Sequence, residues 1–231
     1  MKFKLFLKHK KFKFNLFLNH KIKFNLFLKH KIKFKIEKYI FTIGAPRSGT
    51  TFLCQLLNNH PNILVSNEDR TIYKILHQNI NFKTAIINSN INAFDQFQNA
   101  YNKNIGIQNK WKHLDKKKLL EKKTILIAGD KKSGQNAIIF NNNKNEFINL
   151  FKKPNIFFLQ IVRNPINAAK SYEKSHPHEV FGFNDALEKI LKINSYGFEL
   201  GKMLHKNYVK IYYEDLVANP SKIMKELIDL I

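Results

Sequence analysis

Residues 44–51 read Gly-Ala-Pro-Arg-Ser-Gly-Thr-Thr and bring three hydroxyl side chains and one arginine together between glycines. The apolar run YIFTI at 39–43 precedes them and an amphipathic pattern follows, which is typical of a strand turning tightly into a helix. Such a turn exposes backbone N–H groups, and the dipole of the helix adds partial positive charge behind them. We therefore predict an anion site at residues 44–51, with phosphate as the best ligand.

The spacing of this segment matches that of nucleotide-binding loops of the form GxxxxGK[ST], with one substitution. Thr50 stands where those loops carry lysine, and the cation is Arg47, inside the loop. The N–H groups of residues 47–51 and the hydroxyls of Ser48, Thr50 and Thr51 are predicted to hold the anion. The displaced cation is the main clue to function.

A second anion site is predicted around Arg163, which follows the apolar run NIFFLQIV at 155–162. Arg163 lies at the carboxyl end of a predicted strand, where α/β sheets bind ligands. Its guanidinium can hold a phosphate through two parallel hydrogen bonds. A helix is expected after Pro165, and Ser171, two turns into it, would face the same way as Arg163.

Alternating strands and helices must position these residues. Strands are predicted at 39–43, 124–129, 155–162 and 208–213, and helices near 69–80, after Pro165 and after Pro220. This order predicts an α/β fold of three layers, a parallel sheet with helices on both faces. Residues 81–122 are rich in Asn and Lys and give no specific signal.

The N-terminal segment differs from the rest of the chain. The formal net charge is +23, and thirteen lysines and one acid among the first 38 residues contribute +12 of it. KFNLFLNHKI at 13–22 recurs as KFNLFLKHKI at 23–32 with a strand-like period of two. We predict a basic repetitive extension at 1–37 and one domain at 38–231. The extension is interpreted as low-complexity sequence without a selected role, or as an arm contacting nucleic acid or an anionic membrane.

Composition excludes several classes of protein. Cys54 is the only cysteine, which excludes an intrachain disulfide and a cysteine-based zinc site. No run of eighteen apolar residues occurs, and lysines interrupt any apolar core of a signal peptide. A reducing, cytoplasmic location is therefore expected.

Three segments carry a resemblance to a known family. IGAPRSGTTFLCQLLNNHP at 43–61 resembles the 5′-phosphosulfate segment of sulfotransferases that use 3′-phosphoadenylyl sulfate (PAPS). LQIVRNPINAAKSY at 159–172 is similar to their 3′-phosphate segment, and YYEDLVANP at 212–220 resembles a third signature. The segments occur in the family's order, and the motifs are most similar to those of tyrosylprotein and bacterial-type members. The chain is thus identified as a P-loop sulfotransferase over residues 39–231.

The resemblance implies PAPS as the sulfuryl donor and a parallel sheet of the P-loop type. A sulfuryl group carries less negative charge than a phosphoryl group, so one cation and backbone donors suffice, and no metal is expected. The residues implied to bind the donor are Pro46, Arg47, Ser48, Gly49, Thr50, Thr51, Arg163 and Ser171.

The resemblance also implies catalytic residues. Glu68 follows the HP pair at 60–61 by the interval of the family's base, and Arg70 matches a further site position. His60 is the alternative base. Lys131 resembles a lysine that holds the transferred group together with Arg47, and Lys132 is its alternative.

Several points stay open in the sequence. The acceptor is a hydroxyl or amine on a small molecule, glycan, lipid or protein, and the oligomeric state is undetermined. A nucleotide kinase or NTPase, and a non-catalytic polyanion-binding relative, are the competing functions. Tyr213, Glu214 and Asp215 are expected to order the fold. The chain ends at Ile231, before the segment with which relatives usually close over the nucleotide, so a compact or truncated member is expected.

Overall fold

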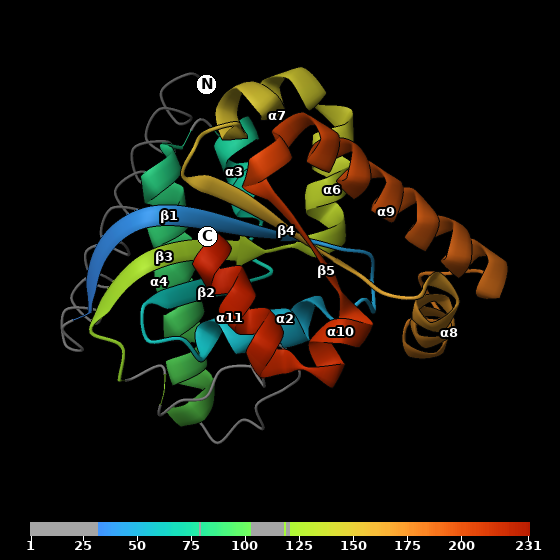
Figure 1. The fold of residues 1–231 in the computed structure, drawn as a ribbon, viewed down its shortest axis with the longest axis horizontal. Helices are drawn as coiled ribbons and strands as arrows, with labels where there is room; N and C mark the ends of the chain where they lie inside the picture. Colours follow the sequence, from blue (N-terminus) through green and yellow to red (C-terminus); the bar gives the residue numbers. More distant parts are fainter. Residues whose placement is uncertain (1–31, 79, 103–117, 119–120) are drawn as a thin grey trace, which may run out of the picture.

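The computed structural model describes residues 32–78, 80–102, 118 and 121–231, with only the backbone described for 93–102. Within this part of the chain, five strands form one parallel sheet in the order β2-β3-β1-β4-β5 (Figure 1). The strands are β1 (Lys33–Ile43), β2 (Ile63–Asn67), β3 (Thr124–Lys131), β4 (Ile156–Val162) and β5 (Tyr208–Tyr212). The predicted α/β fold with a parallel sheet is confirmed.

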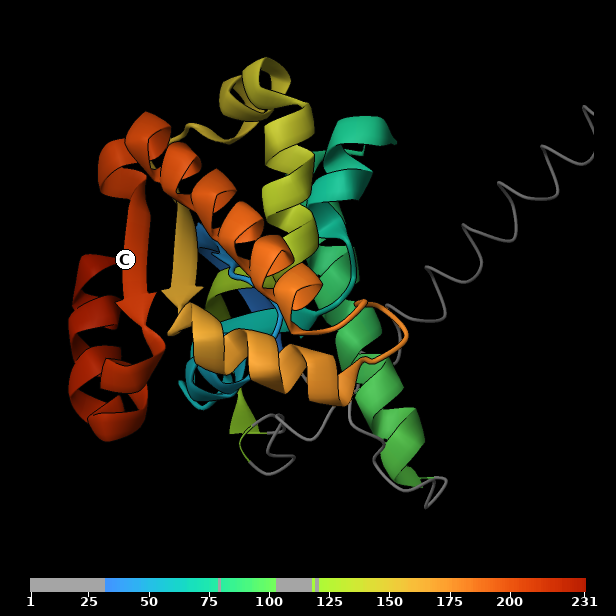
Figure 2. The same ribbon diagram turned by 90° about the vertical axis from the view of Figure 1, so that its right-hand side faces the viewer.

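Helices cover both faces of the sheet, and Figure 2 shows α9 and α11 on opposite sides of it. One face packs against α2 (Thr50–Asn58), α10 (Tyr213–Ala218) and α11 (Pro220–Leu230). The other face packs against α3 (Thr71–His77), α4 (Phe82–Asn102), α6 (Ser133–Asn142), α7 (Lys144–Phe151), α8 (Pro165–Ser175) and α9 (Phe183–Leu204). A 3₁₀ turn, η1 (His205–Asn207), joins α9 to β5.

Both faces of the sheet are apolar, which is why helices cover both. Alternate side chains of a strand point to opposite faces. Phe41 therefore packs with the larger cluster, beneath α4 and α7, whereas Ile40 packs with the smaller one, beneath α2 and α11. The Phe41 ring stacks on Phe158 with their centroids 5.4 Å apart. This core fixes the central strands that carry the loop at 44–51.

The predicted elements are largely present. The helix predicted near 69–80 is α3, and the helix expected after Pro165 is α8. The Asn164 side chain caps α8 by accepting hydrogen bonds from the N–H groups of Ile166 and Asn167. Strand β2 and the long helix α9 were not predicted. In the region 81–122, helix α4 fills residues 82–102, and most of 103–120 lies outside the described residues.

The sheet reaches into the range predicted as an extension. β1 begins at Lys33, which lies opposite Thr124 of β3, and Phe34 lies opposite Ile125. Ile32 is already part of the core. Residues 33–37 thus belong to the sheet, whereas the repeat copies, apart from Ile32, lie outside the described residues.

None of the helices in the described part of the chain combines the length and the apolarity needed to cross a membrane.

Candidate active site

Every strand of the sheet delivers one site residue or segment to the same edge. The loop at 44–51 follows β1, Glu68 follows β2, Lys131 ends β3, Arg163 follows β4 and Tyr213 follows β5. In a parallel sheet all carboxyl ends meet at one edge, and ligands bind there. The fold therefore gathers residues that are up to 169 positions apart in the chain.

The loop between β1 and α2 has the form expected of an anion site. Gly49, the residue before α2, has φ 91°, and the Ser48 N–H donates to the Ala45 carbonyl at 3.2 Å. The Ser48 hydroxyl is buried and has no hydrogen-bond partner among the described residues. Because buried polar groups are normally paired, this hydroxyl fits an anion held by the loop.

Gly49 is expected to tolerate no side chain. A Cβ there would lie 2.3 Å from Cδ2 of Tyr213, in a backbone conformation that L residues rarely adopt. Gly49→Ala is expected to lower the free energy of unfolding by about 1–3 kcal/mol or more, measured by denaturant unfolding. The same substitution in a Tyr213→Ala protein is the matched control, because the backbone conformation at Gly49 is shared and the close contact is removed. Equal losses in the two backgrounds would contradict a role for the Tyr213 contact.

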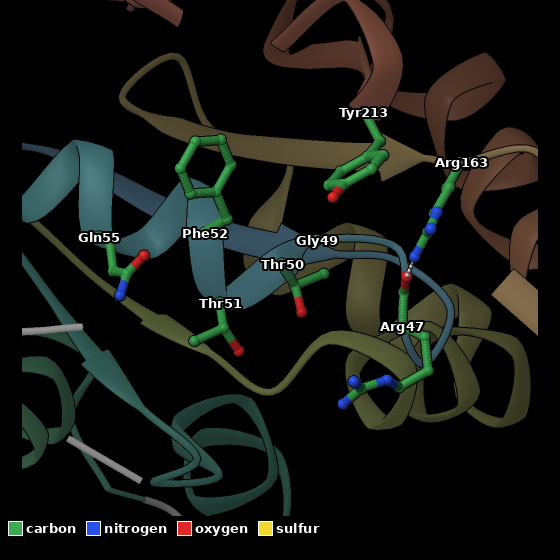
Figure 3. Close-up of a pocket in the computed structure, with 8 residues that line it drawn as sticks. All are labelled: Arg47, Gly49, Thr50, Thr51, Phe52, Gln55, Arg163 and Tyr213. Carbon is green, nitrogen blue, oxygen red and sulfur yellow. Dashed lines mark hydrogen bonds between the residues drawn. The ribbon is translucent and has the colours of Figure 1, made fainter. Parts of the chain in front are cut away.

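Arg163 and Tyr213 form one side of a cavity beside the loop (Figure 3). Arg163 Nη1 donates to the Arg47 carbonyl at 3.0 Å, and its guanidinium lies 4.7 Å from the centre of the Tyr213 ring. Sequence reasoning expected Tyr213 to order the fold and missed its place in this wall. The cavity has a volume of about 330 Å³ and is lined by Arg47, Gly49, Thr50, Thr51, Phe52, Gln55, Arg163 and Tyr213.

The Arg47 side chain turns away from Arg163, as Figure 3 shows. Its Nε donates to the Ser171 hydroxyl of α8 at 3.2 Å. Ser171 thus lies beside the loop through its bond to Arg47, and it is not among the residues that line the cavity with Arg163. That Ser171 and Arg163 hold the same phosphate stays a prediction. The backbone of Arg47 is left-handed, with φ 64°. Such strain in a non-glycine residue is found most often at functional sites.

A second cavity of about 430 Å³ lies next to the first. Arg47, Thr50 and Thr51 line both cavities, so the loop forms their common wall. The other residues that line the second cavity are Ala45, Pro46, Glu68, Lys131, Lys132, Ser133, Gly134, Gln135, Tyr172, His176 and Glu179. Two neighbouring cavities that meet at the same loop residues are suited to two substrates whose reacting groups meet at the loop.

Glu68 is held by both candidate lysines. Its Oε1 accepts a hydrogen bond from Lys131 Nζ at 2.5 Å, and its Oε2 accepts one from Lys132 Nζ. Burial pushes the pKa of Glu68 up, but the two lysines outweigh burial and hold that pKa below its usual range. Glu68 also has a left-handed backbone, with φ 65°. The structure thus unites Glu68, Lys131 and Lys132 in one ionic cluster.

Asp130, which sequence reasoning missed, holds the segment that carries Glu68. The carboxylate is fully buried, and it accepts hydrogen bonds from the Ser66 hydroxyl at 2.9 Å and from the Thr71 N–H at 2.9 Å. Burial raises the pKa of Asp130. Asp130 ties β3 to the turn between β2 and α3, which fixes where Glu68 points.

The two remaining sequence candidates lie elsewhere. His60 sits in the turn after α2, where its Nδ1 accepts from the Asn62 N–H at 3.2 Å. Arg70 is the residue before α3 and has a left-handed backbone. Neither residue lines the two cavities.

The segment at the end of α8 supplies cavity residues that sequence reasoning did not single out. Tyr172 Oη donates to Glu179 at 2.8 Å, and burial, aided by the Glu179 carboxylate, raises the pKa of Tyr172 to about 12. His176 lies between them in the chain and lines the same cavity. The spacing of Tyr172 and His176, one helical turn, was the available signal.

Comparison with known proteins decides the family. A profile of the sulfotransferase family matches residues 39–231, most of the chain. The chain belongs to the sulfotransferase family. No match was found among curated proteins. Membership of this family supports the interpretation that the chain is an enzyme that transfers sulfuryl groups.

A solved sulfotransferase structure shares the fold. The sulfotransferase domain of the Synechococcus PCC 7002 olefin synthase is 18% identical, with a TM-score of 0.50 over 84% of this chain and 73% of that one. The sulfotransferase of Alicyclobacillus acidocaldarius is 13% identical, with a TM-score of 0.49 over 84% and 80% of the two chains. In the described part of this sulfotransferase, no three His, Cys, Asp or Glu side chains gather into a metal-binding group.

Proposed function

We propose that this sulfotransferase moves a sulfuryl group from PAPS to a hydroxyl or amine in the second cavity. One observation carries the proposal: two cavities share a wall made of the loop residues Arg47, Thr50 and Thr51. A donor held in the first cavity would place its reactive group at these shared residues, where an acceptor in the second cavity would meet it directly. Holding two reactants in the correct orientation lowers the activation free energy of the reaction by a large amount.

Residues on the donor side suit a nucleotide with phosphates at both ends. Ser48, with its unpaired buried hydroxyl, and the N–H groups at the start of α2 would hold the 5′-phosphosulfate. Arg163 and Ser171 would hold the 3′-phosphate. Arg163 is oriented for this by its bond to the loop and its stacking on Tyr213.

Residues of the shared loop and of the second cavity suit the transfer itself. PAPS would supply an electrophilic sulfuryl group whose leaving group is a phosphate. Arg47 and Lys131 would stabilise the negative charge that develops on the transferred group and the leaving phosphate. Glu68 would accept the proton of the acceptor hydroxyl or amine. Because β1 begins at Lys33 and Ile32 is buried in the core, we further propose that the catalytic domain begins at Ile32, and that the reaction does not require residues 1–31.

The test compares two nucleotides by calorimetry. Adenosine 3′,5′-bisphosphate is expected to bind at least about tenfold more tightly than ATP with magnesium, because Arg163 and the loop match two separated phosphates. Tighter binding of ATP would overturn the proposal and favour a kinase or NTPase.

A second measurement addresses catalysis. Radiolabelled PAPS is incubated with a panel of small alcohols, amines, glycans and tyrosine peptides, and labelled products are counted. Transfer to at least one class is expected. Nucleotide binding without transfer to any of them would favour a non-catalytic polyanion-binding relative.

A further inference from the structure

Two lysines share one carboxylate in the second cavity. The side chains are largely enclosed, with 9% of Lys131, 23% of Lys132 and 26% of Glu68 exposed. The Glu68 N–H also donates to the Lys131 carbonyl at 2.7 Å, so the backbones are joined as well. Both carboxylate oxygens therefore already accept a strong charge-assisted bond. A carboxylate in this state is a weak proton acceptor.

The two lysines differ in where they attach to the fold. Lys131 is the last residue of β3 and lies opposite Thr42 of β1, two residues before the loop at 44–51. Lys132 lies outside the sheet, as the residue that caps α6. Of the two ammonium groups, that of Lys131 belongs to the strand adjacent to the loop strand.

We propose that the donor activates the base, with Lys131 shifting from Glu68 to the sulfuryl group and Lys132 staying as a positioning residue for Glu68. This inference rests on the proposed function. Once Lys131 has shifted, Glu68 takes the proton as the acceptor oxygen bonds to sulfur and the bond from sulfur to the 5′-phosphate breaks. Glu68 then carries one proton, and the bisphosphate leaves with the electrons of the broken bond.

Electrostatics gives the direction of the effect. The negatively charged sulfuryl oxygens attract the Lys131 ammonium group, which pairs with Glu68 before the donor binds. Loss of a cation partner raises the pKa of a carboxylate. The nearby anion raises that pKa further. A base whose pKa approaches the working pH is more effective in proton transfer. Glu68 would thus become a competent base only when there is a group to transfer.

The other charged and titratable groups near Glu68 are bonded to partners other than Glu68. Among the other residues that line the cavity, Tyr172 is bonded to Glu179, and Arg47 is bonded to Ser171. Beneath the site, Asp130 is occupied by Ser66 and Thr71. His176 also lines the cavity, and its Nδ1 is hydrogen-bonded to the Ser175 hydroxyl at 2.7 Å.

The test measures proton uptake when nucleotides bind to the full-length protein. Calorimetry at about pH 5, near the range of carboxyl groups, is done in two buffers of different ionisation enthalpy. PAPS and adenosine 3′,5′-bisphosphate are compared, since only PAPS carries the sulfuryl group. Subtracting the values for Glu68→Gln removes protons that belong to the nucleotide phosphates.

The corrected uptake is expected to be about half a proton with PAPS and near zero with the bisphosphate. Equal corrected uptake with both nucleotides, or none with PAPS, would overturn the inference. Failure of both nucleotides to bind would instead overturn the proposed function. This comparison uses the wild-type protein and Glu68→Gln, and it needs no folded lysine variant.

Lysine variants separate the two roles. Lys131→Met is expected to abolish the corrected proton uptake. It is also expected to weaken the binding of PAPS more than the binding of the bisphosphate. Lys132→Met is expected to retain PAPS binding but to move the acid limb of the kcat profile up by about one pH unit, because Glu68 loses a cation. Lys144→Met is the matched control, since Lys144 pairs with Glu199 at 2.5 Å and lines neither cavity. An unchanged limb in folded Lys132→Met would refute its positioning role.

Discussion

Arg163→Ala is expected to weaken the binding of adenosine 3′,5′-bisphosphate by about 100-fold or more, the usual loss when one partner of a close charge pair is truncated. The guanidinium is fixed by its bond to the Arg47 carbonyl and by the Tyr213 ring, so it is ordered before the ligand arrives. Little entropy is then lost on binding. Calorimetry of the variant and the wild-type protein measures the change.

Two further variants make this result specific to the site. Arg163→Lys is also expected to bind poorly, because an ammonium group neither stacks as a plane nor forms two parallel bonds. Lys174→Ala removes one exposed positive charge from α8 without touching the cavities. It is expected to bind normally. Similar losses for Lys174→Ala and Arg163→Ala would mean that general positive charge, rather than Arg163, attracts the nucleotide.

Glu68→Gln is expected to lower kcat by about 10²–10⁴-fold, the usual contribution of a general base. Gln has the size of Glu but does not accept a proton at neutral pH. Donor affinity should change by less than about tenfold, because Glu68 contacts the lysines rather than the nucleotide loop. Single-turnover transfer from PAPS separates kcat from binding.

Glu199→Gln is the matched control for that experiment. Glu199 of α9 pairs with Lys144 of α7, and neither residue lines either of the two cavities. Its variant should keep full activity. Transfer at the wild-type rate in Glu68→Gln would show that another group takes the proton, and His176 would be tested next because it lines the same cavity.

Local sequence determined the segments that act within a few residues of one another. The apolar run at 155–162 and the Asn-Pro pair at 164–165 dictate a strand, a turn and a capped helix, and the structure has them. The loop at 44–51 can be recognised from the sequence because its glycines and hydroxyl residues determine the local backbone conformation within a few positions. The family also followed from such segments, since each motif is continuous in the chain.

Tertiary structure alone decided which of these segments meet. Lys131 and Lys132 reach Glu68 because β2 pairs with β3, and nothing in an 8-residue strand specifies its neighbour. Arg47 meets Ser171 across 124 positions, and Tyr213 lies where a side chain on Gly49 would be. Strand order and register are set by packing both faces of the sheet at once, a property of the whole chain. The sequence therefore identified the candidate chemistry, and the fold decided that its base is held by its own lysines.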